Sequence, residues 1–171
     1  RGLLHAGPLL DPARVAATDR LEAFARAQPG VGGVLGLPSH LAALAFVSGG
    51  GSGHRVEPKA EEIESLVRLF GTVRGEDRRR EILDDAMRRT VVMCLLKNAN
   101  YQDTARIMTA LRAHAAQELL PLGITLDFAG DVAVSQAMIP AIVRTQLASL
   151  ALTLLLNFVV LWAAFRSAAA A

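Results

Sequence analysis

An uncharged run near the end of the chain constrains the fold more than any other feature. It reads QLASLALTLLLNFVVLWAAF, extends from Gln146 to Phe165, and lies between Arg144 and Arg166. In a helix, about 20 apolar residues cover the ~30 Å hydrocarbon core of a bilayer. Its polar side chains are all uncharged, and membrane helices tolerate them: Gln146, Ser149, Thr153 and Asn157. The run lies too far from the N-terminus for a signal peptide, so we predict a transmembrane helix rather than a buried helix of a soluble core.

The rest of the chain has the composition of a soluble domain. Arg, Glu and Asp are scattered through it, and no other segment approaches the length of a membrane span. The formal net charge is only +2, without a basic arm, so nucleic-acid binding gets no support. The single cysteine, Cys94, excludes an internal disulfide, and its apolar neighbours predict a buried, unreactive thiol. Because the chain begins at Arg1 and stops in a run of alanines, we expect it to be a piece of a larger protein.

The first half predicts a helix, a strand and a second helix. Asp11 is a favoured N-cap and Pro12 suits the first helical position, so a helix should begin there and end at Gln28-Pro29-Gly30. Residues 30–38 (GVGGVLGLP) then predict a short strand, and residues 39–46 a brief helix. We expect Val34 on one face of the strand, and on the other face Val31, Leu35 and Leu37.

The middle of the chain predicts a linker, an amphipathic helix and a charged surface. The glycine-rich loop near 48–57 lacks the Gly-Lys-Ser/Thr ending of a phosphate-binding loop, so we interpret it as a flexible linker. Residues 58–70 predict a helix whose apolar stripe is formed by Ile63, Leu66, Val67 and Phe70. The triple arginine over residues 78–80 stands beside several acids, which indicates a solvated, locally paired surface.

The second half predicts a strand, a helix and another strand. The strand covers Arg88 to Leu96 and the helix Asn100 to Leu119, with Ile107, Leu111, Ala115 and Leu119 on one side. Residues 123–129 (GITLDFA) alternate strictly, so Ile124, Leu126 and Phe128 should point inward. Together the halves predict an α+β fold, a ferredoxin-like split βαβ sheet with helices on one face. We expect its first strand to be truncated, cut away before Gly2.

No constellation of catalytic residues is visible in the sequence. The four histidines, His5, His40, His54 and His114, lie far apart and without metal-ligand spacing. Asp84 and Asp85 are adjacent, so on a helix they cannot face one another. The GVGGVLG segment (30–36) has the glycines of a dinucleotide-binding turn but occupies a predicted strand. We therefore expect no enzyme activity, no cofactor and no metal.

The final helix should begin well before the membrane. Residues 131–145 continue the helical pattern from Gly130-Asp131, and we expect a break or bend at Pro140. From Asp131 to Phe165 the helix would be about 50 Å long, more than a bilayer needs. The predicted layout is a domain over 1–130, a helical approach over 131–145, a span over 146–165 and a stub over 166–171. Little flexible sequence separates domain and helix, so the joint should be rigid.

The order of these pieces resembles the first extracytoplasmic loop of RND-superfamily transporters of the MMPL type, the so-called predicted exporters. The similar pieces are the segment from Leu10 to Leu44, the predicted strand at 88–96, and GITLDFAGD at 123–131. The most specific piece is the approach to the span and its exit through Phe165-Arg166-Ser167. The resemblance covers nearly the whole chain.

The resemblance implies a porter domain followed by the second membrane helix of a proton-driven exporter of lipids or other hydrophobic molecules. Residues 1–145 would lie on the periplasmic side of the bacterial cytoplasmic membrane, and Arg166 at its cytoplasmic edge. The domain would form part of the substrate path, while the proton relay would lie in a later membrane helix outside this sequence. The partners would be the bilayer, a hydrophobic or lipid substrate, other transmembrane helices of the parent protein and, in an oligomer, a second copy.

Within this interpretation, Gly130, Asp131 and Pro140 form the junction that couples membrane to domain, and Asn157 contacts a neighbouring helix. A different class is also open, a single-span, membrane-anchored module that binds a ligand or senses a signal. A protein-export subunit on the same superfamily fold and an anchored hydrolase are less favoured, the latter because no catalytic constellation is visible. The number of further membrane spans in the parent protein would discriminate between exporter and single-span module.

Overall fold

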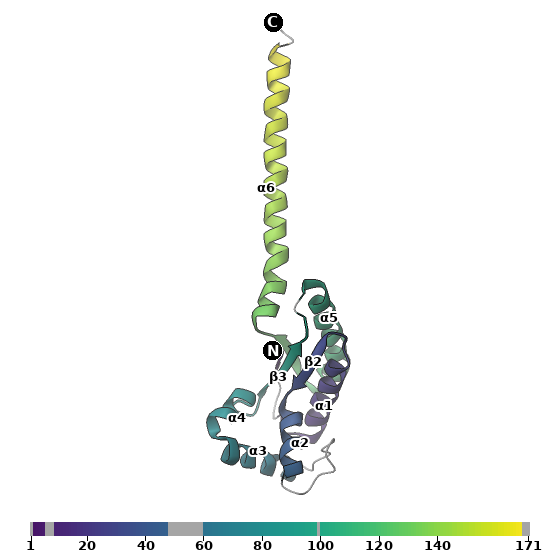
Figure 1. The fold of residues 1–171 in the computed structure, drawn as a ribbon, viewed down its shortest axis with the longest axis vertical. Helices are drawn as coiled ribbons and strands as arrows, with labels where there is room; N and C mark the ends of the chain where they lie inside the picture. The colour runs from purple at the N-terminus through teal and green to yellow at the C-terminus, as the bar shows by residue number, and fades with distance from the viewer. Residues whose placement is uncertain (1, 6–8, 48–59, 99, 169–171) are drawn as a thin grey trace. The chain divides into compact units, whose positions relative to one another are not determined.

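The computed structural model describes residues 2–5, 9–47, 60–98 and 100–168, and the fold is α+β with one long apolar helix near the C-terminus (Figure 1). The chain divides into two compact units, Arg1–Val132 and Ala133–Ala171, which are described separately.

The first unit contains a four-stranded antiparallel sheet in the order β2-β3-β1-β4. The strands are β1 (Gly2–His5), β2 (Val31–Leu35), β3 (Arg89–Leu96) and β4 (Thr125–Phe128). The expectation that the first strand is cut away before Gly2 is wrong, because β1 pairs with β3 on one side and with β4 on the other. A run of four residues without polar alternation carries too little periodicity to be recognised as a strand.

Two helices connect the strands and lie side by side on one face of the sheet (Figure 1). They are α1 (Pro12–Arg26) and α5 (Tyr101–Glu118). The predicted N-cap of α1 is confirmed, since Asp11 Oδ1 accepts the Ala13 N–H at 2.8 Å. The predicted stripe of α5 is also confirmed, because Ile107, Leu111 and Ala115 are buried in the core. A short 3₁₀ turn, η1 (Leu120–Leu122), leads from α5 towards β4.

Strand β4 confirms its predicted alternation, whereas β2 departs from it. Leu126 and Phe128 of β4 are partly buried against the core, and Thr125 and Asp127 are exposed. In β2, the pairing with β3 shifts between Val31 and Gly33, so a bulge inserts an extra residue. Val31 and Val34 are therefore both buried while Leu35 is 46% exposed, which corrects the expected faces. Leu37, expected in this strand, is the first residue of the next helix.

The described residues of the long connection from β2 to β3 form three helices. They are α2 (Leu37–Val47), α3 (Ala60–Arg74) and α4 (Glu76–Ile82). The predicted stripe of α3 is confirmed by its buried residues Ile63, Leu66 and Val67, with Phe70 partly exposed. The predicted linker over 48–57 lies outside the described residues. Gly75 separates α3 from α4 with a φ of +90°, a conformation that suits glycine.

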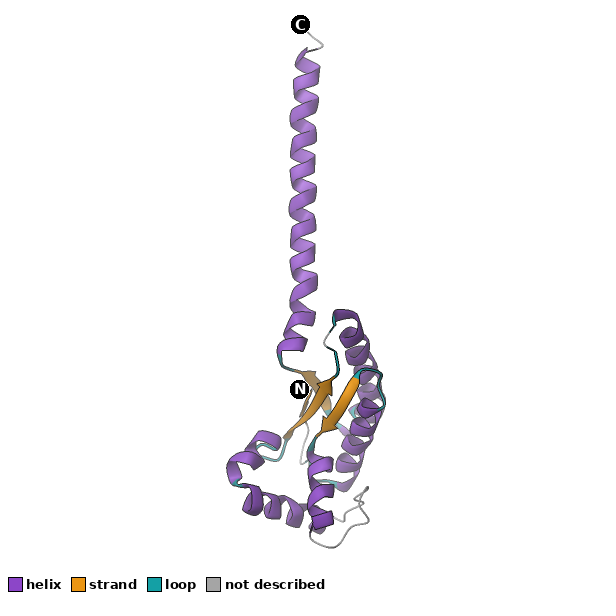
Figure 2. Ribbon diagram, viewed as in Figure 1, coloured by secondary structure: helices purple, strands orange, loops and turns teal. Residues whose placement is uncertain are grey.

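The last helix, α6 (Asp131–Ala168), is drawn as one uninterrupted helix in Figure 2, and Pro140 lies within it. Of the break or bend expected at this proline, the break is wrong, and the bend stays a prediction. A proline removes one backbone hydrogen bond, and a long helix with many remaining bonds on both sides can accommodate that loss. Within the described part of the chain, α6 is the one helix long and apolar enough to cross a membrane.

Candidate functional site

The first candidate site is the joint between sheet and final helix. Strand β4 ends at Phe128 and α6 begins at Asp131, so only Ala129 and Gly130 separate them. Gly130 has a φ of +105°, a region that L side chains rarely adopt, and this conformation turns the chain from strand into helix.

Only two of the four residues singled out from the sequence lie together at this joint. Gly130 and Asp131 are adjacent and exposed, and the Asp131 carboxylate stands in the first turn of α6, where the helix dipole favours a negative charge. Pro140 lies about two and a half turns further along the helix. Asn157 lies deep in the apolar run, in the second unit of the chain.

The second candidate is a buried carboxyl group that the sequence-based reasoning missed. Glu22 on α1 is 1% exposed. Ser39 Oγ from α2 donates a hydrogen bond to Glu22 Oε2, and Arg26 Nη2 lies 3.9 Å from the same oxygen. Glu22 Oε1 is buried and has no hydrogen-bond partner within the described residues. Burial raises the pKa of this carboxyl to about 7, against the opposing effect of the Ser39 hydrogen bond.

The surroundings of Glu22 link three elements of the domain. Arg26 Nη2 also donates to the carbonyl of Val34 on β2, at 3.2 Å. Gly36 lies directly after β2 and close to Glu22. A Cβ atom added at Gly36 would contact Glu22 Oε1, and this Cβ would lie 3.1 Å from Val92 Cγ2 on β3. A signal existed in the sequence, since Glu22 stands seven residues after Val15 and therefore on the apolar face of its helix.

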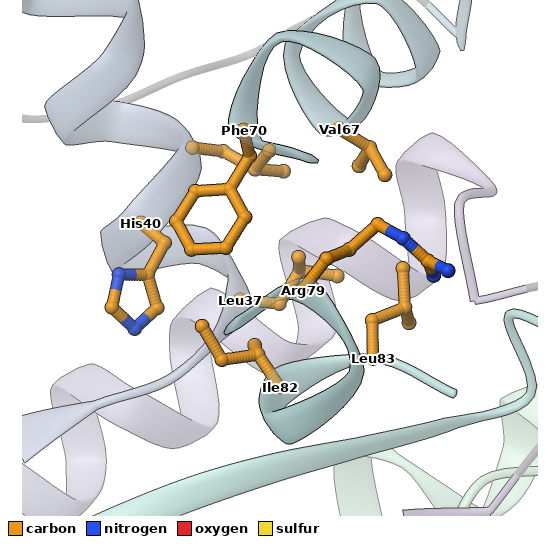
Figure 3. Close-up of a pocket in the computed structure, with 8 residues that line it drawn as sticks. Leu37, His40, Val67, Phe70, Arg79, Ile82 and Leu83 are labelled. Atoms are coloured by element: carbon orange, nitrogen blue, oxygen red, sulfur yellow. The ribbon is translucent and has the colours of Figure 1, made fainter. Parts of the chain in front are cut away.

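The third candidate is an apolar pocket between α2, α3 and α4 (Figure 3). The side chains around it are Leu37, His40, Leu41, Val67, Phe70, Arg79, Ile82 and Leu83. Figure 3 shows the Phe70 ring beside the His40 imidazole, and their centroids are 5.5 Å apart. Burial, together with the nearby charge of Arg74, lowers the pKa of His40 and favours its neutral form. The pocket has room for about one water molecule, too little for a lipid.

The triple arginine forms the predicted paired surface at two of its three positions. Arg78 and Arg80 are exposed and paired with neighbouring acids. Arg79 instead covers the pocket with its side chain only 13% exposed, and its guanidinium points away from His40 (Figure 3). It bonds Glu76 and Asp85 at 2.6 Å each, which raises the pKa of Arg79 and lowers that of Asp85. The ion pair with Asp85 connects α4 to the turn before β3.

The three histidines that the structure describes lie in three different elements. His40 lines the pocket, whereas His114 on α5 stacks on Phe24 at 4.1 Å. His5 lies in β1, and His54 falls outside the described residues. No group of three potential metal ligands occurs among the residues that the structure describes. Cys94 on β3 is half-buried rather than buried, and burial raises the pKa of its thiol.

The chain matches no family model, no curated protein and no solved structure.

Proposed function

We propose that this chain is part of a membrane exporter of the MMPL type in the RND superfamily. In this proposal the first unit is a periplasmic porter domain, and α6 is a transmembrane helix of the bacterial cytoplasmic membrane. The exporter moves lipids or other hydrophobic molecules and is driven by protons through residues outside this sequence. The chain itself performs no catalysis and transmits movement between membrane and domain.

The strand order supports a ferredoxin-like porter domain. The order β2-β3-β1-β4, with α1 and α5 as the connections on one face, is that expected of a split βαβ unit. The helices α2, α3 and α4 are then an insertion between its second and third strands. Fold alone does not establish function. The main support for the proposed function is therefore the short connection between the domain and the membrane helix.

The observation that carries the proposal is the two-residue connection between β4 and the unbroken helix α6. A domain that is only anchored to a membrane functions equally well on a flexible polar linker. A domain that must follow the tilt of a helix needs a short joint, as in transporters whose halves move as rigid bodies. The continuity of α6 through Pro140 strengthens this argument, because an intact helix transmits a tilt along its whole length.

The test is a flexible insertion at the joint in the longer protein. A Gly-Ser linker placed between Ala129 and Gly130 should abolish export of a labelled lipid from cells while membrane insertion is unchanged. The matched control is the same linker after Gly75, where an added Cβ would have no neighbour within 4 Å. Unchanged export with the linker at the joint would contradict the coupling mechanism.

The same lipid-export assay distinguishes an exporter from a single-span sensor or ligand-binding module. An exporter has several further apolar helices in the longer protein, and its deletion causes the labelled lipid to accumulate inside the cell. A single-span module has no further spans, and its deletion leaves the distribution of the lipid unchanged.

A further inference from the structure

The polar residues within the apolar run of α6 share one side of the helix. An α-helix turns by about 100° per residue, so positions four apart differ by about 40° around the axis. All five uncharged polar residues between Arg144 and Arg166 consequently fall within about 120° of the circumference: Thr145, Gln146, Ser149, Thr153 and Asn157. The three aromatic residues of the same stretch fall on the opposite side: Phe158, Trp162 and Phe165.

Asn157 lies close to the middle of the span. The midpoint between Arg144 and Arg166 is residue 155, and Asn157 is about 3 Å from it along the helix axis. In a bilayer this position is surrounded by hydrocarbon, where no water can satisfy a polar side chain.

The two threonine hydroxyls of this polar face differ from the Asn157 amide in their hydrogen bonding. Thr145 Oγ1 donates to the carbonyl of Ala141, and Thr153 Oγ1 donates to the carbonyl of Ser149, both at 2.9 Å. The amide of Asn157 carries two donors and one acceptor. It makes no side-chain hydrogen bond within the described residues. Its hydrogen-bonding capacity is therefore unused within its own helix.

We infer that the polar face binds another transmembrane helix, and that this helix presents an amide or hydroxyl side chain at the depth of Asn157. The inference rests on the membrane span of the proposed function. Small hydroxyl residues beside Asn157 let two helix backbones approach closely, and an interhelical hydrogen bond satisfies the amide. The opposite face, with its aromatic and leucine side chains, then contacts lipid.

The test uses a synthetic partner of the stated chemistry. The full chain is reconstituted in phosphatidylcholine vesicles with a tryptophan-free, leucine-rich transmembrane peptide that carries one central Asn and a dansyl group. Energy transfer from Trp162, the single tryptophan of the chain, reports association. Because the peptide's Asn is central, its depth matches Asn157 in either orientation. We expect the Asn peptide to bind about 5- to 30-fold more tightly than its all-leucine version.

Variants of the chain test whether the polar face is responsible. Asn157→Leu should abolish the preference for the Asn peptide, and Thr153→Leu should weaken binding by adding bulk to the same face. The matched controls change the opposite face at similar depth. Leu155→Ala and Ala151→Leu should leave binding unchanged. Equal binding of both peptides, or sensitivity to the control variants instead, would overturn the inference.

Insertion is measured in the same samples, which separates this inference from the proposed function. Quenching of Trp162 by brominated lipids shows that α6 lies in the bilayer. Quenching without a preference for the Asn peptide overturns the helix-binding face alone. Absence of quenching overturns the membrane span, and with it both proposals.

Discussion

The buried carboxyl of Glu22 makes the stability of the domain depend on pH in a direction that can be worked out. In the unfolded chain the group titrates near its ordinary value of 4.5, and in the folded domain burial raises its pKa to about 7. Between these values the folded protein holds a proton that the unfolded chain has released. Stability contributed by this group is therefore complete below pH 4.5 and is lost as the pH rises to about 7.

The magnitude follows from the difference between the two pKa values. Each pKa unit corresponds to about 1.4 kcal/mol, so the loss across this window is about 3 kcal/mol. Because Glu22 is 1% exposed, solvent screening reduces this value little. The nearby charges act in opposite directions, since Asp19 raises the pKa and Arg26 lowers it.

The test is Glu22→Gln, which keeps the shape of the side chain and cannot ionise. Urea unfolding of the full chain in detergent micelles, followed by circular dichroism at pH 4 to 8, measures the free energy of unfolding. Relative to wild type, the variant should gain about 3 kcal/mol between the two ends of this range.

Glu64→Gln is the matched control, because Glu64 is an exposed glutamate on α3 and its replacement should leave the pH dependence unchanged. Parallel pH curves for wild type and Glu22→Gln would refute the reasoning.

Three further substitutions test the packing of the domain by the same unfolding assay. Gly36→Ala should destabilise the domain by about 1–3 kcal/mol, because the new methyl group would contact Glu22 and Val92. This loss of stability should be smaller in a Glu22→Ala background, and an equal loss there would contradict the steric explanation. Asp11→Ala should lower stability by about 1 kcal/mol through the lost N-cap of α1, and no change would show that the cap is dispensable. Leu119→Ala should lower it by about 2–5 kcal/mol, since Leu119 is 0% exposed, and a loss below that range would indicate that the site collapses around the smaller residue.

Helices and strands could be predicted from the sequence where the residues that define them are neighbours in the chain. The cap formed by Asp11 and Pro12, the stripe of α5 and the apolar run of α6 each depend on neighbouring residues, and each is present in the structure. The alternation of β4 belongs to the same group.

The features that escaped prediction depend on partners distant in sequence. The bulge between Val31 and Gly33 is a property of the pairing with β3, so the sequence of β2 alone does not reveal that Val31 and Val34 are both buried. Strand β1 is stabilised by neighbours on both sides rather than by its own short sequence. Glu22 could have been found on the apolar face of its helix, but its partner Ser39 comes from a different helix.

Depth-dependent quenching of Trp162 tests the central claim, that α6 crosses a membrane, most directly. The chain has a single tryptophan, and Trp162 lies about 10 Å from the midpoint of the span along the helix axis. Reconstituted in vesicles of lipids brominated at defined positions, it should emit at short wavelength, be quenched most by bromines part-way along the acyl chains, and resist iodide in the water. Quenching by iodide without quenching by any brominated lipid would contradict the membrane span.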